Sequence, residues 1–298
     1  MSDILDIKTV TECNCCLGCK TLHPQACVIR LDQSNVEQHS IKFDFYTILL
    51  IENDSCDCCC CGRKYYDYSN ATMVFLPPDR PFDMAHDKAL PQKGWLLAFH
   101  PDLLFGTNLS NTIDSYTFFS YNKNEALHLS QREKNTIENC LREMDEELHH
   151  PIDKHSKTLI TRYIELLLDY CTRFYERQFI TRENKNKAII NNTDKLIDEY
   201  LTSGRMEKGL CPSPAYCAGK LHLSTSYFCD LLKFETGKTF NEYFQLRRLD
   251  ISKKMLLQPD CTPSIVASRL GFSSVRYFSL LFKKITGFAP NEYRLSQN

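Results

Sequence analysis

The sequence lacks any continuous apolar stretch that approaches the roughly 18 residues of a membrane-spanning helix. Its first six residues include two acids and no basic residue, so they also lack the basic stretch and apolar core of a secretory signal. Both absences argue against a membrane protein or an exported one, and we expect a cytoplasmic protein. There is little net charge either, because 36 basic and 37 acidic residues nearly cancel over 298 residues.

The small net charge hides an uneven distribution along the chain. Residues 188–298 contain 15 basic and 10 acidic residues, whereas residues 1–187 contain 21 basic and 27 acidic residues. A basic region suits a polyanion such as DNA, because neutralised phosphates release counterions and this supplies affinity for any sequence. The length also allows two domains, each with a core of its own.

Short strands are predicted in the first hundred residues. The segments at 41–52, 64–68, 72–76 and 95–99 are rich in Ile, Val, Phe and Tyr, and turn sequences separate them. Several short strands at this spacing predict a small antiparallel barrel or sandwich.

Two helices are predicted to follow the strands. Ser130 with Glu133 three residues later is a capping-box pattern that begins a helix ending near residue 149, and a second helix covers 152–179. Each helix has an apolar stripe, formed by Ile137, Leu141, Met144 and Leu148 in the first and by Leu159, Tyr163, Leu166, Leu167, Tyr170 and Phe174 in the second. The stripes either pack on the strand domain or pair with a second copy of the chain. Residues 181–192 are polar and predict a linker.

A repeat with a period of 50 residues lies in the C-terminal part. The matching positions are Tyr227-Phe228 with Tyr277-Phe278, Leu231 with Leu281, Lys233 with Lys283, Thr236-Gly237 with Thr286-Gly287, and Asn241-Glu242-Tyr243 with Asn291-Glu292-Tyr293. Each copy predicts a short helix, a tight turn and a longer helix, at 213–221 and 224–236 and again at 263–270 and 273–286. This order predicts two helix-turn-helix units.

Helical periodicity assigns an inner and an outer face to each longer helix. The inner faces, expected to be buried, hold Phe228, Leu231 and Leu232 in the first copy and Phe278, Leu281, Phe282 and Ile285 in the second. The outer faces hold Ser226, Cys229, Asp230 and Lys233 in the first copy and Arg276, Ser279, Leu280 and Lys283 in the second.

The outer faces are candidate base readers, because an α-helix fits the major groove with its N-terminal residues nearest the base edges. Arg276 is the strongest candidate for a bidentate contact with guanine. Asp230 suits an intramolecular pair, with a cytosine contact as the alternative. The full set of predicted DNA-binding residues is Thr225, Ser226, Cys229, Lys233, Arg248, Ser274, Val275, Arg276, Ser279 and Lys283.

A helix that joins the two units is predicted from Thr239, where Glu242 completes a capping box, to about Leu257. Its rigidity would hold the two longer helices near one turn of DNA apart, so that both enter successive major grooves on one face. Its basic residues either contact phosphate or lie on a solvated surface; they are Arg247, Arg248, Lys253 and Lys254.

The C-terminal region closely resembles that of the AraC/XylS-type transcription regulators of bacteria. The segment that matches the family's C-terminal signature is GFSSVRYFSLLFKKITGFAPNEYR at residues 271–294, and the resemblance extends over about 188–294. Residues 215–224, AYCAGKLHLS, further resemble versions common in Bacteroidetes-type members. The resemblance implies a sequence-specific transcription factor that binds double-stranded promoter DNA and recruits RNA polymerase.

Members of that family often place a cupin-like domain before the DNA-binding domain, which implies an α+β chain. Residues 1–180 would form a cupin-like antiparallel β barrel or sandwich with a helical tail, 181–192 a linker, and 193–298 an all-α domain with two helix-turn-helix units. The first domain would bind a small-molecule effector or form a homodimer. His86 and His100 stand apart from any His-x-His pair, so we predict no cupin metal site, no cofactor and no catalytic residue.

Ten of the 16 cysteines precede residue 62, at positions 13, 15, 16, 19, 27, 56 and 58–61. Thiolates at such spacings can bind Zn²⁺ or Cu⁺ or exchange disulfides. Zinc sites usually show two separated Cys-x-x-Cys pairs, and consecutive residues of a strand point to opposite faces. We therefore expect these cysteines to be small apolar residues of a hairpin, with a thiol or metal sensor as the alternative.

Some DNA-repair methyl acceptors also join cysteine sites to this type of DNA-binding domain, which makes an enzyme-like alternative worth weighing. Their Pro-Cys-His-Arg motif is absent from the sequence. We therefore expect a regulator that is not an enzyme.

Overall fold

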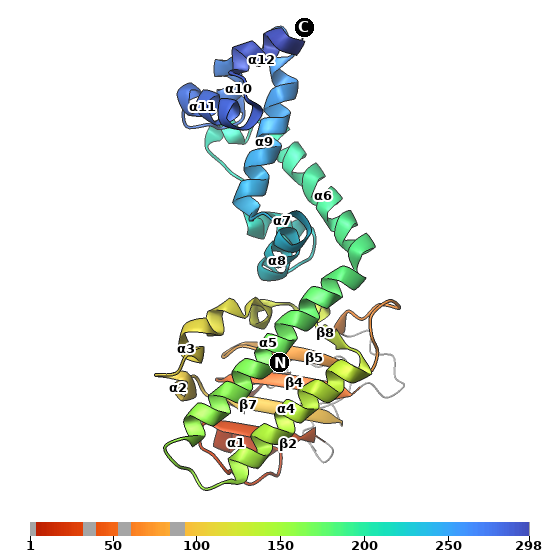
Figure 1. Ribbon diagram of the computed structural model, residues 1–298, viewed down its shortest axis with the longest axis vertical. Helices are drawn as coiled ribbons and strands as arrows, with labels where there is room; N and C mark the ends of the chain where they lie inside the picture. Colours follow the sequence, from red (N-terminus) through yellow and green to blue (C-terminus); the bar gives the residue numbers. More distant parts are fainter. Residues whose placement is uncertain (1–3, 32–39, 53–60, 84–92, 298) are drawn as a thin grey trace. The chain divides into compact units, whose positions relative to one another are not determined.

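The computed structural model describes residues 4–31, 40–52, 61–83 and 93–297, and the chain divides into two compact units, Met1–Arg182 and Glu183–Asn298 (Figure 1). The boundary lies within the segment expected to be a linker. The structure differs from that expectation, because helix α6 (Glu183–Thr202) occupies residues 183–192. Its polar side chains mostly form the exposed side of the helix, while Asn186 and Thr193 face inward and are buried.

Unit 1 contains two β-sheets. The five-stranded sheet is antiparallel and has the order β2 (Ala26–Arg30), β7 (Gly94–Phe99), β4 (Tyr46–Glu52), β5 (Ala71–Leu76), β8 (Leu127–Leu129). The three-stranded sheet has the order β1 (Ile4–Ile7), β3 (Ser40–Phe43), β6 (Pro81–Asp83), and its β1–β3 pair is parallel. The predicted α+β class, with an N-terminal β region before a helical part, is confirmed.

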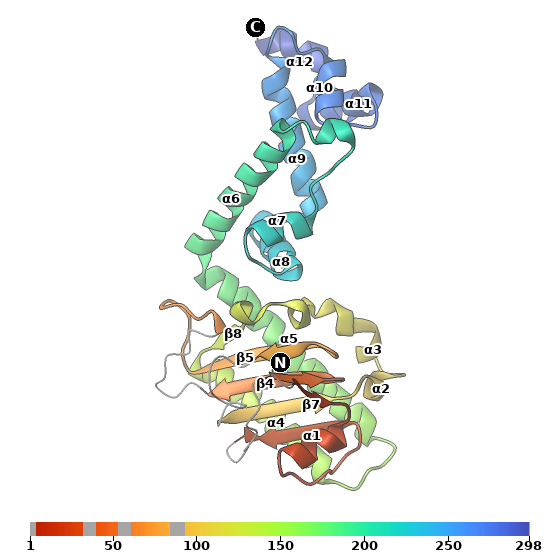
Figure 2. The same ribbon diagram turned by 180° about the vertical axis from the view of Figure 1, so that it is seen from behind.

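The five-stranded sheet is buried on both faces, which explains why β5 and β7 read as continuous apolar runs rather than as alternating ones. One face packs against the three-stranded sheet and α1 (Val10–Cys16) in a core that includes Leu49, Val74 and Phe43. On the other face, Met73 Sδ lies 3.8 Å from Cys171 Sγ of α5. Helices α4 (Gln131–His149) and α5 (Ser156–Thr181) run side by side over that face (Figures 1 and 2).

The predicted strand at 64–68 is wrong. These residues form a turn in which the Asp67 amide donates to the Lys64 carbonyl at 3.0 Å and the Asp67 carboxylate accepts from the Lys64 amide at 2.8 Å. Apolar composition predicted a strand there, but the aspartate side chain competes for the backbone and favours a turn. Four short strands, β1, β2, β6 and β8, are absent from the sequence-based expectation, because three to five residues show too little alternation.

The predicted capping box of α4 is confirmed. The Ser130 hydroxyl accepts from the Glu133 amide at 3.4 Å, and the Glu133 carboxylate accepts from the Ser130 amide at 2.8 Å. Helix α5 begins later than residue 152, because the Asp153 carboxylate accepts from the amides of His155 and Ser156. Between β7 and β8 the chain forms α2 (Pro101–Leu104), α3 (Leu109–Thr112) and three 3₁₀ turns (Ile113–Ser115, Thr117–Ser120 and Lys123–Glu125).

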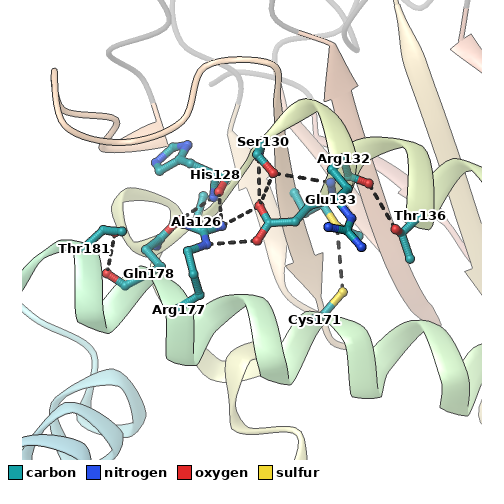
Figure 3. A network of polar contacts seen from close by, with 11 residues as sticks. Ala126, His128, Ser130, Arg132, Glu133, Thr136, Cys171, Arg177, Gln178 and Thr181 are labelled. Atoms are coloured by element: carbon teal, nitrogen blue, oxygen red, sulfur yellow. Dashed lines mark hydrogen bonds and ion pairs between the residues drawn. The ribbon is translucent and has the colours of Figure 1, made fainter.

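A polar network joins the C-terminal end of α5 to β8 and the start of α4 (Figure 3). Gln178 accepts from the His128 amide at 2.8 Å and donates to the Ala126 carbonyl at 3.1 Å. Arg177 donates to both carboxylate oxygens of Glu133, at 2.9 and 2.8 Å. These bonds attach the last turns of α5 to the edge of the sheet.

A buried ion pair fixes the last residue of unit 1. The Arg182 guanidinium donates to both carboxylate oxygens of Asp67, at 2.8 and 2.7 Å, and both side chains are almost completely buried. Burial opposes the charge of Asp67, but the guanidinium prevails and holds the pKa of that carboxyl below its usual range. The turn at 64–67 is therefore attached to the point where α5 ends.

Unit 2 is helical. After α6 and a 3₁₀ turn (Met206–Lys208), it consists of α7 (Pro214–Lys220), α8 (Thr225–Thr236), α9 (Phe240–Leu256), α10 (Pro263–Arg269), α11 (Val275–Thr286) and α12 (Pro290–Gln297), as Figure 2 shows. The pairs α7–α8 and α10–α11 occupy the residues at which the repeat predicts two helix-turn-helix units. The capping box predicted at Thr239 is present at the start of α9. Both longer helices end at a glycine with positive φ, Gly237 and Gly287.

The buried imidazole of His128 leads to a pH-dependent stability. Burial lowers the pKa of His128 to about 4, so the folded chain keeps this ring neutral. Between about pH 6.5 and 4 only the unfolded chain binds the proton, so stability must fall as the pH falls through that range. We expect unit 1 to lose about 2–4 kcal/mol of unfolding free energy through this group.

The measurement is urea unfolding at pH 7 and pH 4.5, followed by the fluorescence of Trp95, which is the chain's one tryptophan and lies in β7. In a His128→Gln variant the unfolding free energy should differ less between the two pH values, because the imidazole is removed. Every other titrating group is retained, so the change reports on His128 alone. An equal pH dependence in both proteins would contradict the assignment.

Candidate DNA-binding interface

The rotation of α8 and α11 is fixed by the faces that they bury. Phe228, Leu231 and Leu232 of α8 are fully buried, as predicted, and so are Phe278 and Phe282 of α11. All of these except Leu231 belong to one hydrophobic core of unit 2. Burial of each side chain of this size contributes roughly 1.5–3 kcal/mol to the stability of the fold. Turning either helix about its axis would expose several of them to water, so the rotation is strongly disfavoured.

Each of these helices starts in the same way. The Ser224 hydroxyl accepts from the Tyr227 amide at 3.2 Å, and the Ser274 hydroxyl accepts from the Tyr277 amide at 3.1 Å. Serine N-caps of this kind fix the first turn, which is the part of a helix that can approach base edges most closely. The Ser274 hydroxyl is therefore used as the N-cap of α11, although the residue is exposed.

The predicted residues of α8 are unequally accessible. Thr225 and Lys233 are exposed, whereas Ser226 and Cys229 are partly buried. The Cys229 side chain packs against the hydrophobic core of unit 2, and burial raises the pKa of its thiol. The outer face of α8 therefore offers a small polar surface with a single exposed lysine among the predicted residues.

The predicted residues of α11 are more accessible. Val275, Arg276 and Lys283 are exposed, and Ser279 is partly buried. The prediction that Ile285 is buried is wrong, because its side chain is 45% exposed. The core contacts α11 only as far as Phe282, so the last turn of the helix extends past it.

The helix pairs α7–α8 and α10–α11 differ in charge. Residues 262–287 contain four basic and no acidic residues, and all four basic side chains are exposed: Arg269, Arg276, Lys283 and Lys284. Residues 213–237 contain two basic and two acidic residues: Lys220, Lys233, Asp230 and Glu235. The formal charges are therefore +4 and zero, with histidine counted as neutral. Of the two helix pairs, only α10–α11 presents a surface with an excess of positive charge.

The predicted phosphate contact of Arg248 is wrong, because its side chain is buried. The guanidinium donates to the Leu270 carbonyl at 2.9 Å, and its carbon atom lies 3.8 Å from the centre of the Phe272 ring. Burial lowers the pKa of this group. Arg248 therefore holds the turn between α10 and α11 in place from within the core.

The other basic residues of α9 are only partly available. Arg247 pairs with Asp198 and Asp194 of α6, at 2.7 and 3.5 Å. Lys253 pairs with Asp250 at 3.0 Å, whereas Lys254 is exposed. Arg247 thus attaches α9 to α6, and Lys254 is the better candidate for a phosphate contact.

Sequence reasoning missed Arg294 of α12. Its guanidinium donates to the carbonyls of Leu256 at 2.7 Å and Cys261 at 2.8 Å, and also to that of Gln258. These carbonyls belong to the end of α9 and to the connection that leads into α10. Nothing in the local sequence signals this role, because the partners lie 33 to 38 residues away in the chain.

Among the described cysteines, the buried side chains of Cys13 and Cys27 lie within hydrogen-bonding reach of each other. In α1, Cys13 is buried in the core of unit 1, whereas Cys15 and Cys16 are exposed. Cys61 is buried in the same core, and positions 56 and 58–60 lie outside the described residues. Within the described part of the chain, no group of three or more His, Cys, Asp or Glu side chains is arranged to hold a metal ion. The hairpin expected for Cys13 is a helix instead.

Of the two histidines considered for a cupin metal site, His100 has another role. His100 caps α2, where its Nδ1 accepts from the Asp102 amide at 3.2 Å. His86 lies outside the described residues.

None of the helices in the described part of the chain is both long and apolar enough to cross a membrane.

Comparison with known proteins agrees with the geometry of unit 2. A family model described as "Helix-turn-helix domain" matches residues 217–296. The Bacillus subtilis protein named "Uncharacterized transcriptional regulatory protein YesN" is 39% identical over 79 residues, which are 26% of this chain and 22% of that protein. The Escherichia coli protein named "Uncharacterized HTH-type transcriptional regulator YijO" is 26% identical over 167 residues, 56% of this chain and 55% of that protein.

Among solved structures, the C-terminal domain of the two-component response regulator yesN from Fusobacterium nucleatum is 28% identical, with 37% of this chain and 98% of that domain covered and a TM-score of 0.30. The chain spans about half the length, or less, of the two curated relatives. Those relatives are named as transcriptional regulators. Residues 217–296 therefore form a helix-turn-helix domain of the AraC type, similar to domains of proteins named as transcriptional regulators.

Proposed function

We propose that this chain is a sequence-specific transcription factor that inserts α8 and α11 into successive major grooves of double-stranded promoter DNA. The observation that carries the proposal is that two outward-facing helices share one core and are connected by a single rigid helix. Helix α9 has 17 residues and is therefore about 25 Å long, the same order as one turn of DNA at about 34 Å. The protein regulates transcription by binding, without enzymatic activity.

Residues in the first turns of α11 would read bases. Arg276 is exposed, belongs to the first turn and can present its fork to guanine O6 and N7. Val275, beside it, suits contact with a thymine methyl group. Lys283 and Lys284 lie at the other end of the helix, where they suit phosphate contacts.

Helix α8 would contribute differently, because its unit has no net positive charge. Thr225, Ser226 and Cys229 offer hydroxyl and thiol groups, which make neutral contacts to base edges or sugars. The four exposed basic residues of the second unit would then supply most of the phosphate attraction. The α7–α8 pair would thus depend on the α10–α11 pair for most of its affinity for DNA.

The remaining partners follow from the family. RNA polymerase would be the protein partner at the promoter, and bacterial promoters place the protein in the cytoplasm. Unit 1 would be the regulatory part, through a small-molecule effector, a second copy of the chain, or both.

Two substitutions in α11 should separate base reading from phosphate attraction. Arg276→Ala should cost about 1–3 kcal/mol of binding free energy at one base position and relax specificity there. Lys283→Ala should weaken binding to all sequences alike and reduce the slope of log affinity against log salt by about 0.9. The measurement is a titration of DNA selected from a random pool, with each base of the site varied in turn.

Lys195→Ala is the matched control for these titrations, because Lys195 is an exposed lysine on α6. It should change neither specificity nor salt dependence. If Arg276→Ala and Lys283→Ala both bind the selected DNA as the unaltered protein does, the assignment of the outer face of α11 is wrong.

The structural role of Arg248 predicts a different outcome. Arg248→Ala removes a buried side chain and leaves the Leu270 carbonyl without this donor, so unit 2 should lose about 2–4 kcal/mol of unfolding free energy. The salt slope of DNA binding should stay unchanged. Urea unfolding, followed by circular dichroism, measures the unfolding free energy. Unaltered stability together with a reduced salt slope would restore Arg248 as a phosphate contact.

A homodimer is a second proposal for unit 1, and the outer side of α5 supports it. The predicted apolar stripe of this helix is divided: Leu167 and Phe174 are buried, whereas Leu159 and Leu166 are 43% and 45% exposed. Tyr163 and Tyr170 are partly exposed on the same line. Spacings of four, three and four residues place these four side chains on one face, as in paired helices.

Replacing this face should dissociate a dimer without unfolding unit 1. A Leu159→Glu, Leu166→Glu double variant should sediment as a monomer, while the unaltered chain and a Thr158→Glu control sediment as dimers. Trp95 fluorescence should show unchanged unfolding, because both leucines lie outside the core. An unaltered chain that is monomeric at its highest soluble concentration would refute the dimer.

A further inference from the structure

Two buried cysteines contact each other where α1 packs against β2. Cys13 of α1 and Cys27 of β2 are 0% and 6% exposed and belong to the same hydrophobic core of unit 1. Their side chains lie within hydrogen-bonding reach of each other, and both thiols are free in this structure. Because α1 and β2 already pack together, the two sulfur atoms can join without a rearrangement of the fold.

The backbone fixes the positions of both cysteines. Helix α1 starts with a capping box between Thr9 and Glu12, and the Leu17 amide donates to the Cys13 carbonyl at 3.1 Å. Cys27 lies within β2, where it is the register partner of Ala98 in β7. The contact between the two thiols is therefore set by regular structure.

An exposed cysteine lies beside the buried pair. Cys16 is exposed, is the last residue of α1 and follows Cys13 by three positions, so the two side chains are neighbours on the helix. Cys15 is exposed as well, but two positions correspond to about 200° around a helix, which directs it away from Cys13. The Cys19 thiol donates to the Leu17 carbonyl at 3.6 Å. Cys16 is thus the exposed thiol best placed to pass an oxidant inward.

The acidity of the thiols determines how fast they react. The contact with Cys27 and burial raise the pKa of the Cys13 thiol well above its usual range, and burial also raises the pKa of Cys16. The thiolate is the nucleophile in thiol–disulfide exchange, so the reaction is slow near neutral pH. A thiol of high pKa is also a poor leaving group, so a disulfide that includes Cys13 is reduced slowly.

We propose that Cys13 and Cys27 form a reversible disulfide, and that a small organic disulfide, R–S–S–R, oxidises them through Cys16. The Cys16 thiolate attacks one sulfur of R–S–S–R, whose S–S bond breaks and releases R–S⁻. Cys13 then gives up its proton and attacks Cys16 Sγ, which releases the second R–S⁻. Finally Cys27 gives up its proton and attacks Cys13 Sγ, and Cys16 leaves and is protonated again.

The net reaction converts two cysteine thiols and R–S–S–R into one protein disulfide and two molecules of R–SH. Two electrons pass from the sulfurs of Cys13 and Cys27 to the small disulfide, and the two protons of these cysteines end on the two R–S⁻ groups. Cys16 is regenerated and acts only as a relay. No metal or further reductant is required.

The disulfide would attach α1 covalently to β2, an end strand of the described five-stranded sheet. It would close a loop from Cys13 to Cys27 and restrict the unfolded chain, so unit 1 should be more stable when oxidised. Unit 1 would therefore respond to the thiol–disulfide balance around it, separately from the proposed DNA binding of unit 2.

The test is oxidation of the reduced full chain with 2-hydroxyethyl disulfide over several hours, followed by alkylation and tryptic digestion without reductant. Cleavage after Lys8, Lys20 and Arg30 gives peptides 9–20 and 21–30, and Cys27 is the single cysteine of the second peptide. The unaltered chain should yield these two peptides joined, with fragmentation placing the bond at Cys13. Its urea midpoint, followed by Trp95 fluorescence, should rise on oxidation.

Four variants separate the pair from the relay. Cys13→Ala and Cys27→Ala should each abolish the joined peptides. Cys16→Ser should slow their formation by about tenfold or more, because the oxidant then has to reach a buried thiol directly. Cys15→Ser, which alters an exposed cysteine of the same helix, is the matched control and should react at the unaltered rate. Urea unfolding in the reduced state checks that each variant is folded.

Each part of the proposal can fail separately. A Cys27 that stays alkylated in the treated, folded chain, a bond from Cys27 to any other cysteine, or joined peptides that persist in Cys13→Ala would overturn the pairing. Equal rates for Cys16→Ser and Cys15→Ser would overturn the relay through Cys16. None of these results depends on whether the chain binds DNA.

Discussion

The arrangement of unit 2 depends on one constraint, which is that α8 and α11 must bury their aromatic and aliphatic faces in a single shared core. Phe228 and Phe278 occupy equivalent positions of the repeat, and both are completely buried. Because these rings cannot leave the core without a large loss of hydrophobic free energy, the opposite faces are held toward solvent. The residues available for DNA are therefore selected by what the core excludes.

The roles of the basic residues of α9 and α11 depend on where each lies relative to the same core. Arg248 and Arg247 are neighbours in the chain, but one is buried against Phe272 and the other pairs with acids of α6. Both stabilise the positions of helices. Lys283 lies on the side of α11 away from Phe278 and Phe282, where a positive charge keeps its hydration and stays free to attract phosphate. Charge alone thus does not decide which basic residues are accessible to a partner; the position of the charge relative to the core does.

Unit 1 uses α5 in three ways along its length. Its inner side covers the five-stranded sheet, its outer side keeps two leucines exposed, and its last turns are bonded to β8 and to the Ala126 carbonyl just before it. At its end, Arg182 is fixed by the buried pair with Asp67. Such a pair costs desolvation and requires well-formed hydrogen bonds, so it restricts the position of this end more strongly than an exposed pair would. Events at the sheet edge and at the end of α5 are therefore linked within one unit.

The sequence by itself determined the features that depend on local pattern. The 50-residue repeat, the capping boxes at Ser130 and Thr239 and most of the inner faces of α8 and α11 follow from spacing along the chain, because helical geometry brings residues three or four apart to one side. The resemblance of residues 271–294 to a family signature adds the class of partner. Exposure of Arg276 also follows from this periodicity.

Only the tertiary structure decided the features that join residues distant in the chain. The Asp67 carboxylate closes a local turn with Lys64, but its buried partner Arg182 lies 115 positions away in the chain. Arg248 looks like a phosphate contact until Phe272 and the Leu270 carbonyl enclose it, and Arg294 shows no role until the end of α9 is placed beside it. Burial depends on what packs against a side chain, and no local pattern records which distant residue that will be.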